Sequence, residues 1–399
     1  MWNDSSNNKK VIFIAVFILL VFGFVFTKNI PVAMAQNDDP AIELEQWTED
    51  VLSKTDTDSL DEFLPEESFV QMFSFKEFAR SVLSGEYLAD YDSVFEFIKD
   101  AFLINFKKNL RFFVYLFVCV VIYEIFKNFC ADKYIEVKKN VKIIFCFLFC
   151  VILLSSFKTY YDEISGFVDG VFNFTAILFP ILVGLVTMSG AATSASVYSS
   201  FSIFILNTGS YIIRFVLMPS AISIFILSLF GSILKNKRFD RVCEIVKLIF
   251  KYVVVLFFSV FGLLSFVNVV STSSRDGLNL KLTKYAIKNY IPVLGGYISE
   301  GFDFLKGCSI LVKNAFGFCS VLILISMAIS PLLLTLVFVF GFKILSALTG
   351  YVGEGVFSDM FNDVSKAYSN FLTVIIGLFL IMFIFIFLMI MSVWVVWCL

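Results

Sequence analysis

The sequence contains no histidine among its 399 residues, and only 16% of the residues are charged. Without histidine there is no Ser-His or Cys-His nucleophile, no HExxH zinc site and no histidine proton relay. Soluble domains carry about 25% charged residues, whereas 59% of this chain is hydrophobic and 52 residues are Phe. The composition therefore excludes histidine-dependent enzymes and indicates a protein that has lipid as its main solvent.

Other motifs of chemistry are also missing. The eight cysteines contain no CxxC pair and fall mostly in apolar runs, which is typical of small buried side chains rather than a zinc site. There is no GxxxxGK[ST] phosphate loop and no GxGxxG after a strand. We expect no cofactor, no metal site, no nucleic-acid partner and no enzymatic activity.

The charge is distributed in three blocks. Residues 1–35 have net charge +2, residues 36–105 have 18 acidic against four basic residues (net −14), and residues 106–399 have net charge +10. Lys9 and Lys10, the apolar run 11–26 and the sequence Ala33-Met34-Ala35 predict a signal peptide over 1–35, with an uncleaved anchor helix as the alternative. The acidic block 36–105 is then an extracytoplasmic region, and 106–399 is a polytopic membrane domain.

The acidic block has two parts. The acidic composition of residues 36–62, which is poor in aromatic residues, predicts a flexible arm without a core of its own. From Phe63 onward, apolar residues at helical spacing predict two amphipathic helices, broken near Ser84-Gly85 and lying against the membrane or a partner.

The membrane domain predicts an all-α transmembrane bundle with broken or re-entrant helices. The Lys-rich stretches 127–142 and 235–251 should both be cytoplasmic, which requires an even number of crossings between them. Four crossings satisfy this, and so do two crossings with a re-entrant piece. The apolar runs are 110–126, 143–157, 171–188, 197–213, 215–234, 246–270, 315–330, 332–348 and 371–397.

Four crossings place residues 158–170 outside. We further expect 315–348 to form a hairpin split at Pro331, the acidic stretch 349–370 to lie outside, and the last helix to end in the cytoplasm near Trp394 and Trp397. Residues 271–313 are basic, yet the same count puts them outside. They form either an amphipathic helix in the membrane interface or a segment that dips into the bundle.

Two ionisable residues fall in or beside apolar runs, Glu124 and Arg214. A charge at membrane depth suggests an ion or substrate path. Snorkelling or pairing explains both residues as well, since Glu124 lies three residues before Lys127.

Two stretches are rich in small residues or helix breakers. After Pro180, small residues at four-residue spacing, including Gly190 and Ser194, favour close helix packing, or a broken helix that lines a cavity. Pro292 and the pair Gly295-Gly296 should end a helix and turn the chain.

The second stretch belongs to a longer series of motifs, which are Asp276-Gly277, Lys284-Tyr285-Ala286, Asn289, Ile291-Pro292-Val293-Leu294-Gly295-Gly296, Ser299-Glu300 and Lys313-Asn314-Ala315-Phe316-Gly317. This series resembles the signature of the stage III sporulation protein AE family of endospore-forming bacteria. The run Gly190–Ser196, the length near 400, the N-terminal signal and Pro331 resemble that family too.

The resemblance implies a membrane subunit of the multi-protein channel that links mother cell and forespore, in the mother-cell-derived outer forespore membrane. Its implied partners are membrane lipids, other stage III sporulation membrane proteins and a separate ATPase, in a multi-subunit assembly. It carries over no catalytic residue. The alternative function is a self-contained secondary transporter, which predicts inverted repeats and paired charges inside the membrane.

Overall fold

The structure is a computed structural model that describes residues 58–61, 63, 74–83, 91–129, 135–234, 237–290, 295–353 and 355–391. All regular structure in these ranges is helical, and six segments are long and apolar enough to cross a membrane. The predicted all-α polytopic bundle is confirmed. The predicted signal peptide, the arm up to residue 57 and the break near Ser84-Gly85 lie outside the described residues.

The six long segments follow two short helices. These two are α3 (Asp58–Asp61) and α4 (Phe75–Leu83), and α5 continues unbroken past the predicted domain boundary at 105. The turns labelled η are π-helical turns within one helical run over 192–234. The remaining elements are α5 (Tyr91–Phe129), α6 (Ile135–Met188), α7 (Ala192–Phe204), η2 (Ile205–Gly209), α8 (Ser210–Ile212), η3 (Ile213–Leu217), α9 (Met218–Leu234), α10 (Lys237–Tyr290), α11 (Gly295–Val352) and α12 (Gly355–Met391).

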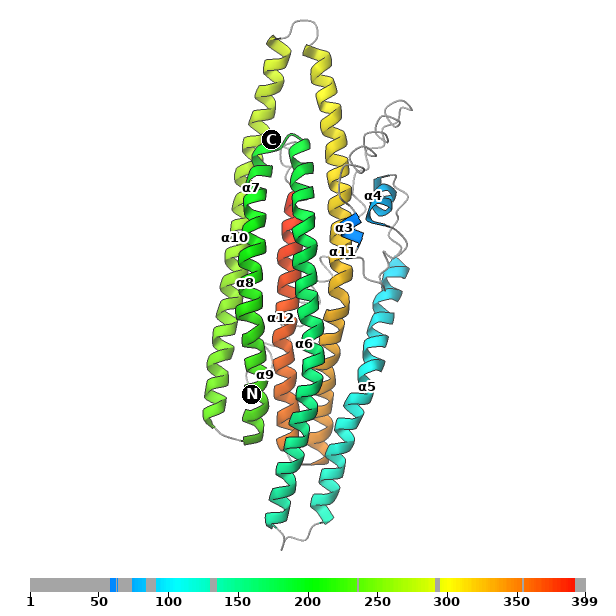
Figure 1. Ribbon diagram of the computed structural model, residues 1–399, viewed down its shortest axis with the longest axis vertical. Helices are drawn as coiled ribbons and strands as arrows, with labels where there is room; N and C mark the ends of the chain where they lie inside the picture. Colours follow the sequence, from blue (N-terminus) through cyan, green and yellow to red (C-terminus); the bar gives the residue numbers. More distant parts are fainter. Residues whose placement is uncertain are drawn as a thin grey trace.

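The helices form an elongated bundle with two distinct ends (Figure 1). At one end, which we call the lysine-rich end, α5 joins α6, α9 joins α10 and α11 joins α12. At the other, which we call the hairpin end, α10 and α11 rise beyond the other helices. The 54 residues of α6 span about 80 Å, far more than the roughly 30 Å of hydrocarbon in a bilayer. Parts of the long helices therefore extend beyond the membrane.

The prediction that residues 158–170 form an outer loop is wrong. They lie inside α6, which joins the apolar runs 143–157 and 171–188 into one helix. The charges of this stretch do not interrupt helical hydrogen bonding, since Lys158, Asp162 and Glu163 all point to the exposed side. Between the two Lys-rich stretches the chain thus crosses twice, once as α6 and once as α7–α9.

The predicted hairpin at Pro331 is also wrong, because α11 runs straight through this residue, as α6 runs through Pro180. Pro331 lacks only the N–H that would donate to the Met327 carbonyl, and such prolines are tolerated inside membrane helices. The Thr335 hydroxyl donates to the Pro331 carbonyl at 2.7 Å and also lies 2.9 Å from the Tyr160 hydroxyl of α6. The proline turn is therefore bound to a neighbouring helix.

Relative to the lysine-rich end, the predicted positions of the described part of 349–370 and of the far end of the last helix are reversed. The turn at Gly353 contacts Glu124 near the C-terminal end of α5, so it lies at the lysine-rich end. The opposite end of α12 reaches Lys313 of α11 at Ile390, so it lies toward the hairpin end. Because α11 is one helix instead of a hairpin, every later segment changes direction relative to the prediction.

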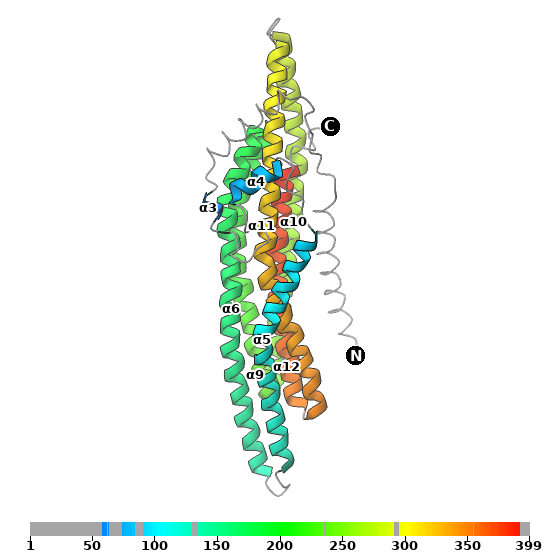
Figure 2. The same cartoon turned by 90° about the vertical axis from the view of Figure 1, so that its right-hand side faces the viewer.

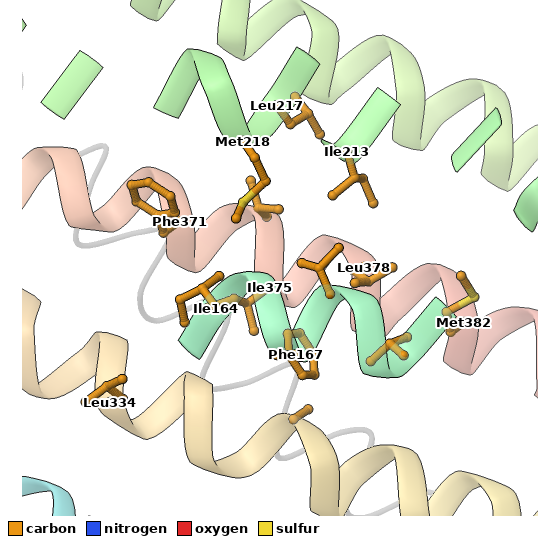
Figure 3. Packing of buried hydrophobic residues seen from close by; sticks show 14 of the residues in the cluster. Ile164, Phe167, Ile213, Leu217, Met218, Leu334, Phe371, Ile375, Leu378 and Met382 are labelled. Carbon is orange, nitrogen blue, oxygen red and sulfur yellow. The ribbon is translucent and has the colours of Figure 1, made fainter. Parts of the chain in front are cut away.

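Helix α12 occupies the centre of the bundle, between α11, α9 and α6. Its buried residues recur at helical spacing on most sides of the helix, as expected for a helix that is enclosed by others. Figure 3 shows side chains of α6, η3 and α11 meeting those of α12 in this core, namely Ile164, Phe167, Ile213, Leu217, Leu334, Phe371, Ile375, Leu378 and Met382.

The described part of the acidic region docks on the bundle (Figure 2). Phe75 of α4 meets Phe316 of α11 edge-on, with ring centroids 5.1 Å apart, and Phe63 contacts Phe174 of α6 at 5.9 Å. The Asp61 carboxylate accepts a hydrogen bond of 2.6 Å from the backbone N–H of Phe75. The first predicted amphipathic helix therefore packs on the chain's own bundle.

Candidate functional site: charged residues at helix ends

The chain breaks sharply between α6 and α7, at the small-residue run of the sequence. Gly190 has φ of 83°, a conformation that favours glycine, and Ala191 precedes the first turn of α7 without a side-chain hydrogen bond to it. The chain therefore breaks in this stretch, as one of the two interpretations predicted, but at Gly190 and not at Pro180. That the break lines a cavity stays a prediction. The break leaves the first backbone N–H groups of α7 without helical acceptors.

Asp276 of α10 accepts hydrogen bonds from these N–H groups. Its two carboxylate oxygens lie 2.9 Å from the nitrogen of Thr193 and 2.8 Å from the nitrogen of Ser194. Its side chain is buried, with the residue only 2% exposed. Asn279, one turn further along α10, lies 3.5 Å from the Thr193 hydroxyl. A carboxylate at a helix N-terminus also interacts favourably with the helix dipole, so Asp276 holds α7 against α10.

Lys313 of α11 makes the converse contact at a C-terminal helix end. Its ammonium group donates a 2.6 Å hydrogen bond to the carbonyl of Ile390, in the last turn of α12. Lys313 is completely buried. One turn further along α11, Gly317 lies so close to the Ile390 side chain that a Cβ atom would overlap it. A positive charge near the last carbonyls of a helix is the favourable arrangement.

These two contacts lie at neighbouring levels of the bundle. Phe385 of α12, just over one turn before Ile390, packs against Phe179 of α6 at 4.7 Å and Tyr198 of α7 at 6.2 Å. Tyr198 is one turn from Ser194. Two segments of the sequence signature, around Asp276 and Lys313, are thus brought together with the Gly190 run on the hairpin-end side of the core.

Two buried polar atoms next to these contacts have no hydrogen-bond partner among the described residues. They are the Ser194 hydroxyl oxygen and the Asn314 side-chain oxygen. Most buried polar atoms in folded proteins are hydrogen-bonded, to protein or to ordered water. A water molecule at either position would satisfy them.

Glu124 plays a similar part at the lysine-rich end. Its buried carboxylate forms an ion pair of 3.3 Å with Lys127, as the pairing interpretation predicted. It also lies directly against Gly353, in the turn before α12, where any Cβ would overlap it. Acidic Glu124 near the start of α12 and basic Lys313 at its end both complement the helix dipole.

Arg214 differs from these buried charges. It lies in η3 and pairs with Asp169 of α6 at 2.7 Å, with the two side chains 40% and 49% exposed. Its guanidinium also stands over the Phe172 ring, 5.6 Å from the centroid. The pairing interpretation is confirmed for Arg214 as well. Neither pairing tests the alternative, a conduit through Glu124 or Arg214, which stays a prediction.

The remaining signature residues lie in the α10–α11 projection. Lys284 and Asn289 belong to α10, which ends at Tyr290, and Gly295-Gly296 begin α11. The predicted helix end and turn are confirmed, while Pro292 itself lies outside the described residues. The basic stretch 271–290 is therefore the end of a long helix and not a separate interfacial helix.

Several residues that contact these charged side chains could not be predicted from the sequence. The count of four crossings places Asp169 outside with the rest of 158–170, and Gly353 and Ile390 carry no signal of their own in the sequence. Hydrogen bonds across 83 and 77 residues, such as those of Asp276 and Lys313, leave no trace in local periodicity.

The geometry defines a polytopic helical membrane protein in which buried charges hold helix ends. Among the described residues no cluster of His, Cys, Asp and Glu could hold a metal ion. The family described as stage III sporulation protein AE matches residues 73–393 of the chain. The chain therefore belongs to the stage III sporulation protein AE family.

One relative supports this assignment over most of its length. The stage III sporulation protein AE of Bacillus subtilis (strain 168) is 25% identical over 344 residues, which cover 83% of this chain and 84% of the relative. No solved structure matches the chain significantly.

Proposed function

We propose that this protein is a non-enzymatic membrane subunit of a multi-protein channel that links mother cell and forespore and that spore development needs after engulfment. It would act in the mother-cell-derived outer forespore membrane, together with other stage III sporulation membrane proteins. A separate ATPase would supply energy, since no nucleotide-binding motif occurs in the sequence.

The exposed ion pair between Asp169 and Arg214 carries the proposal. Both side chains are nearly half exposed, and Arg214 lies between the exposed apolar residues Tyr211 and Phe215. Charged groups at membrane depth are costly against lipid and are found facing protein or water-filled cavities. Lipid alone offers no polar surroundings to the exposed part of this pair, whereas other subunits of a larger assembly, or water enclosed by them, would.

The sides of the membrane follow from the charge distribution. Basic residues concentrate on the cytoplasmic side of membrane proteins, so the lysine-rich end would face the mother-cell cytoplasm. The hairpin end, with α4 docked beside it, would then face the space between the two membranes. That orientation presents the acidic region and the α10–α11 projection to partners there.

Two experiments on the full chain in its spore-forming host test the proposal. Deletion of the gene should block forespore development after engulfment, and affinity purification of the tagged protein from sporulating cells should recover other sporulation membrane proteins. Normal spore formation in the deletion strain contradicts the proposal. Solute transport by the purified protein alone in liposomes would instead establish the secondary transporter.

A further inference from the structure

One side of α6 exposes only small and polar residues over a long distance. Between Leu154 and Met188 no large hydrophobic side chain of α6 is exposed, although the apolar residues Ile143, Phe147 and Val151 are exposed one to three turns earlier. We call the exposed residues of 155–187 the polar face of α6. It includes Lys158, Thr159, Asp162, Glu163, Asn173 and Thr187.

Near Phe172, the polar face of α6 lies at the same depth as an exposed apolar part of α10. A Cβ placed on Gly209 would be 3.7 Å from Phe172 of α6 and 3.8 Å from Phe257 of α10, so these two residues share one level. Phe257 lies within the apolar span 241–264 of α10. Around Phe257, α10 exposes the large apolar side chains Leu256 and Val260.

Around Phe172, in contrast, α6 exposes Asn173 and half of Asp169. At one depth the molecule therefore offers an apolar surface on α10 and a polar surface on α6. A charge at the centre of a membrane helix costs about 2.5–3.5 kcal/mol in hydrocarbon. If lipid surrounded this depth on all sides, the polar surface on α6 would be in hydrocarbon, and if water did, the apolar surface on α10 would be in water.

Apart from α3 and Phe63, which contact α6 near Phe174, the described residues leave the polar face of α6 open. A Cβ placed on Gly166 or on Gly184 would meet no atom within 4 Å. Small residues alone would suit a packed partner helix. Lys158, Asp162 and Glu163, however, are three charged side chains within six residues, and an apolar partner helix would leave them unsolvated. Water satisfies such groups without a matching set of partner charges.

We propose that the polar face of α6 forms part of the wall of a water-filled passage in the assembled complex, while α10 faces lipid. This inference rests on the proposed function, since the passage needs other subunits to close it. The wall carries both signs of charge, Lys158 against Asp162 and Glu163, and Asp169 at its edge is paired with Arg214 of η3. It therefore admits hydrated polar solutes without strong selection for the sign of their charge.

Thiol labelling of the full-length protein in sporulating cells tests the passage. Asn173→Cys on the polar face of α6 is compared with Leu256→Cys and Val260→Cys on α10, which lie at about the same depth. Thr159→Cys, also on the polar face, lies on α6 between that depth and Phe147. A further control, Phe147→Cys, lies on the apolar part of α6. The described native cysteines are buried or half-buried, so the parent protein supplies the background. The reagent is a charged, membrane-impermeant maleimide.

The passage predicts that Thr159→Cys and Asn173→Cys react at least about tenfold faster than the three controls, because thiolates form and react in water and not in lipid. Fast reaction at Leu256→Cys as well would place this depth outside the membrane and overturn the passage. Absence of reaction at both polar-face positions would overturn it too. Reaction that appears only when partner subunits are deleted would also overturn the passage, because it would show that a partner covers this face in the intact complex.

The same variants separate this inference from the proposed function. Each is purified from sporulating cells, and its associated sporulation proteins are measured. Intact association without labelling on the polar face of α6 rejects the passage and leaves the proposed function standing. If the parent protein itself does not associate with other sporulation proteins, the proposed function is rejected.

Discussion

Charges in this protein occur in two different surroundings. Asp276 and Lys313 are buried, and each meets the end of a helix that is distant in the sequence. Asp169 and Arg214 form a pair in the middle of their helical segments, and both are nearly half exposed. The first kind replaces backbone partners that a helix end lacks, whereas the second kind has no such structural role.

The difference has an energetic consequence. Removal of one partner of a buried charged contact costs about 3–5 kcal/mol, because the other group stays buried without a partner. An exposed ion pair contributes only about 0–1 kcal/mol. Changes in the two surroundings should therefore separate: the buried charges determine stability, and the exposed pair determines what surrounds the bundle.

The largest effect is expected for Asp276→Ala. It removes two hydrogen bonds to charged oxygen and leaves the N–H groups of Thr193 and Ser194 without acceptors, so the free energy of unfolding should fall by about 3–5 kcal/mol. The thermal aggregation temperature of the protein in detergent measures the loss. Asp276→Asn keeps one acceptor oxygen and should lie between Asp276→Ala and the parent. An unchanged aggregation temperature for Asp276→Ala would refute the role of this contact.

Lys313 should follow. Lys313→Ala leaves a cavity in the core and a carbonyl of the last turn of α12 without its donor, which predicts a loss of about 2–4 kcal/mol. Lys313→Met keeps most of the volume and loses only the charge and the hydrogen bond. We expect it to recover much of the loss, as apolar replacements of buried charges often do. Equal aggregation temperatures for the two variants would show that packing contributes nothing here.

Two glycines of α11 provide a matched pair. Gly307 has no atom within 4 Å of an added Cβ, whereas at Gly317 the Cβ overlaps Ile390. Gly307→Ala should stabilise the helix by up to about 1 kcal/mol. Gly317→Ala should destabilise the protein by about 1–3 kcal/mol, since overpacking displaces the end of α12. Opposite shifts of the aggregation temperature are the expected result, and shifts in the same direction would contradict the close contact.

The smallest effect on stability is expected for the exposed pair. Asp169→Asn or Arg214→Gln should change the free energy of unfolding by less than about 1 kcal/mol. A loss similar to that of Asp276→Ala, in the same aggregation assay, would remove the distinction between the two surroundings.

The sequence could predict a good part of this arrangement. Hydropathy and lysine placement predicted the all-α bundle and the grouping of the two Lys-rich connections, and Pro292 with Gly295-Gly296 predicted the turn between α10 and α11. They failed at residues 158–170 and at Pro331, because charge and proline were read as chain breaks. Charged residues on an exposed helix face keep the backbone hydrogen bonds intact, and Pro331 removes only one helical N–H donor, so α11 continues through it.

The candidate site could be predicted from the sequence only in part. The signature marked Asp276, Lys313 and Gly317 as unusual, but not what they contact. Those contacts join residues 77 to 83 positions apart, and they arise only when α7, α10, α11 and α12 are packed together. Periodicity describes one helix at a time, so it could not show them.

The two surroundings are separated most sharply by spore formation in cells that carry the double variant Asp169→Asn and Arg214→Gln. We expect a normal amount of protein, a normal aggregation temperature and a strong loss of spores, because the exposed pair serves the assembly and not the fold. A parental number of spores would show that the exposed pair has no role in the assembly.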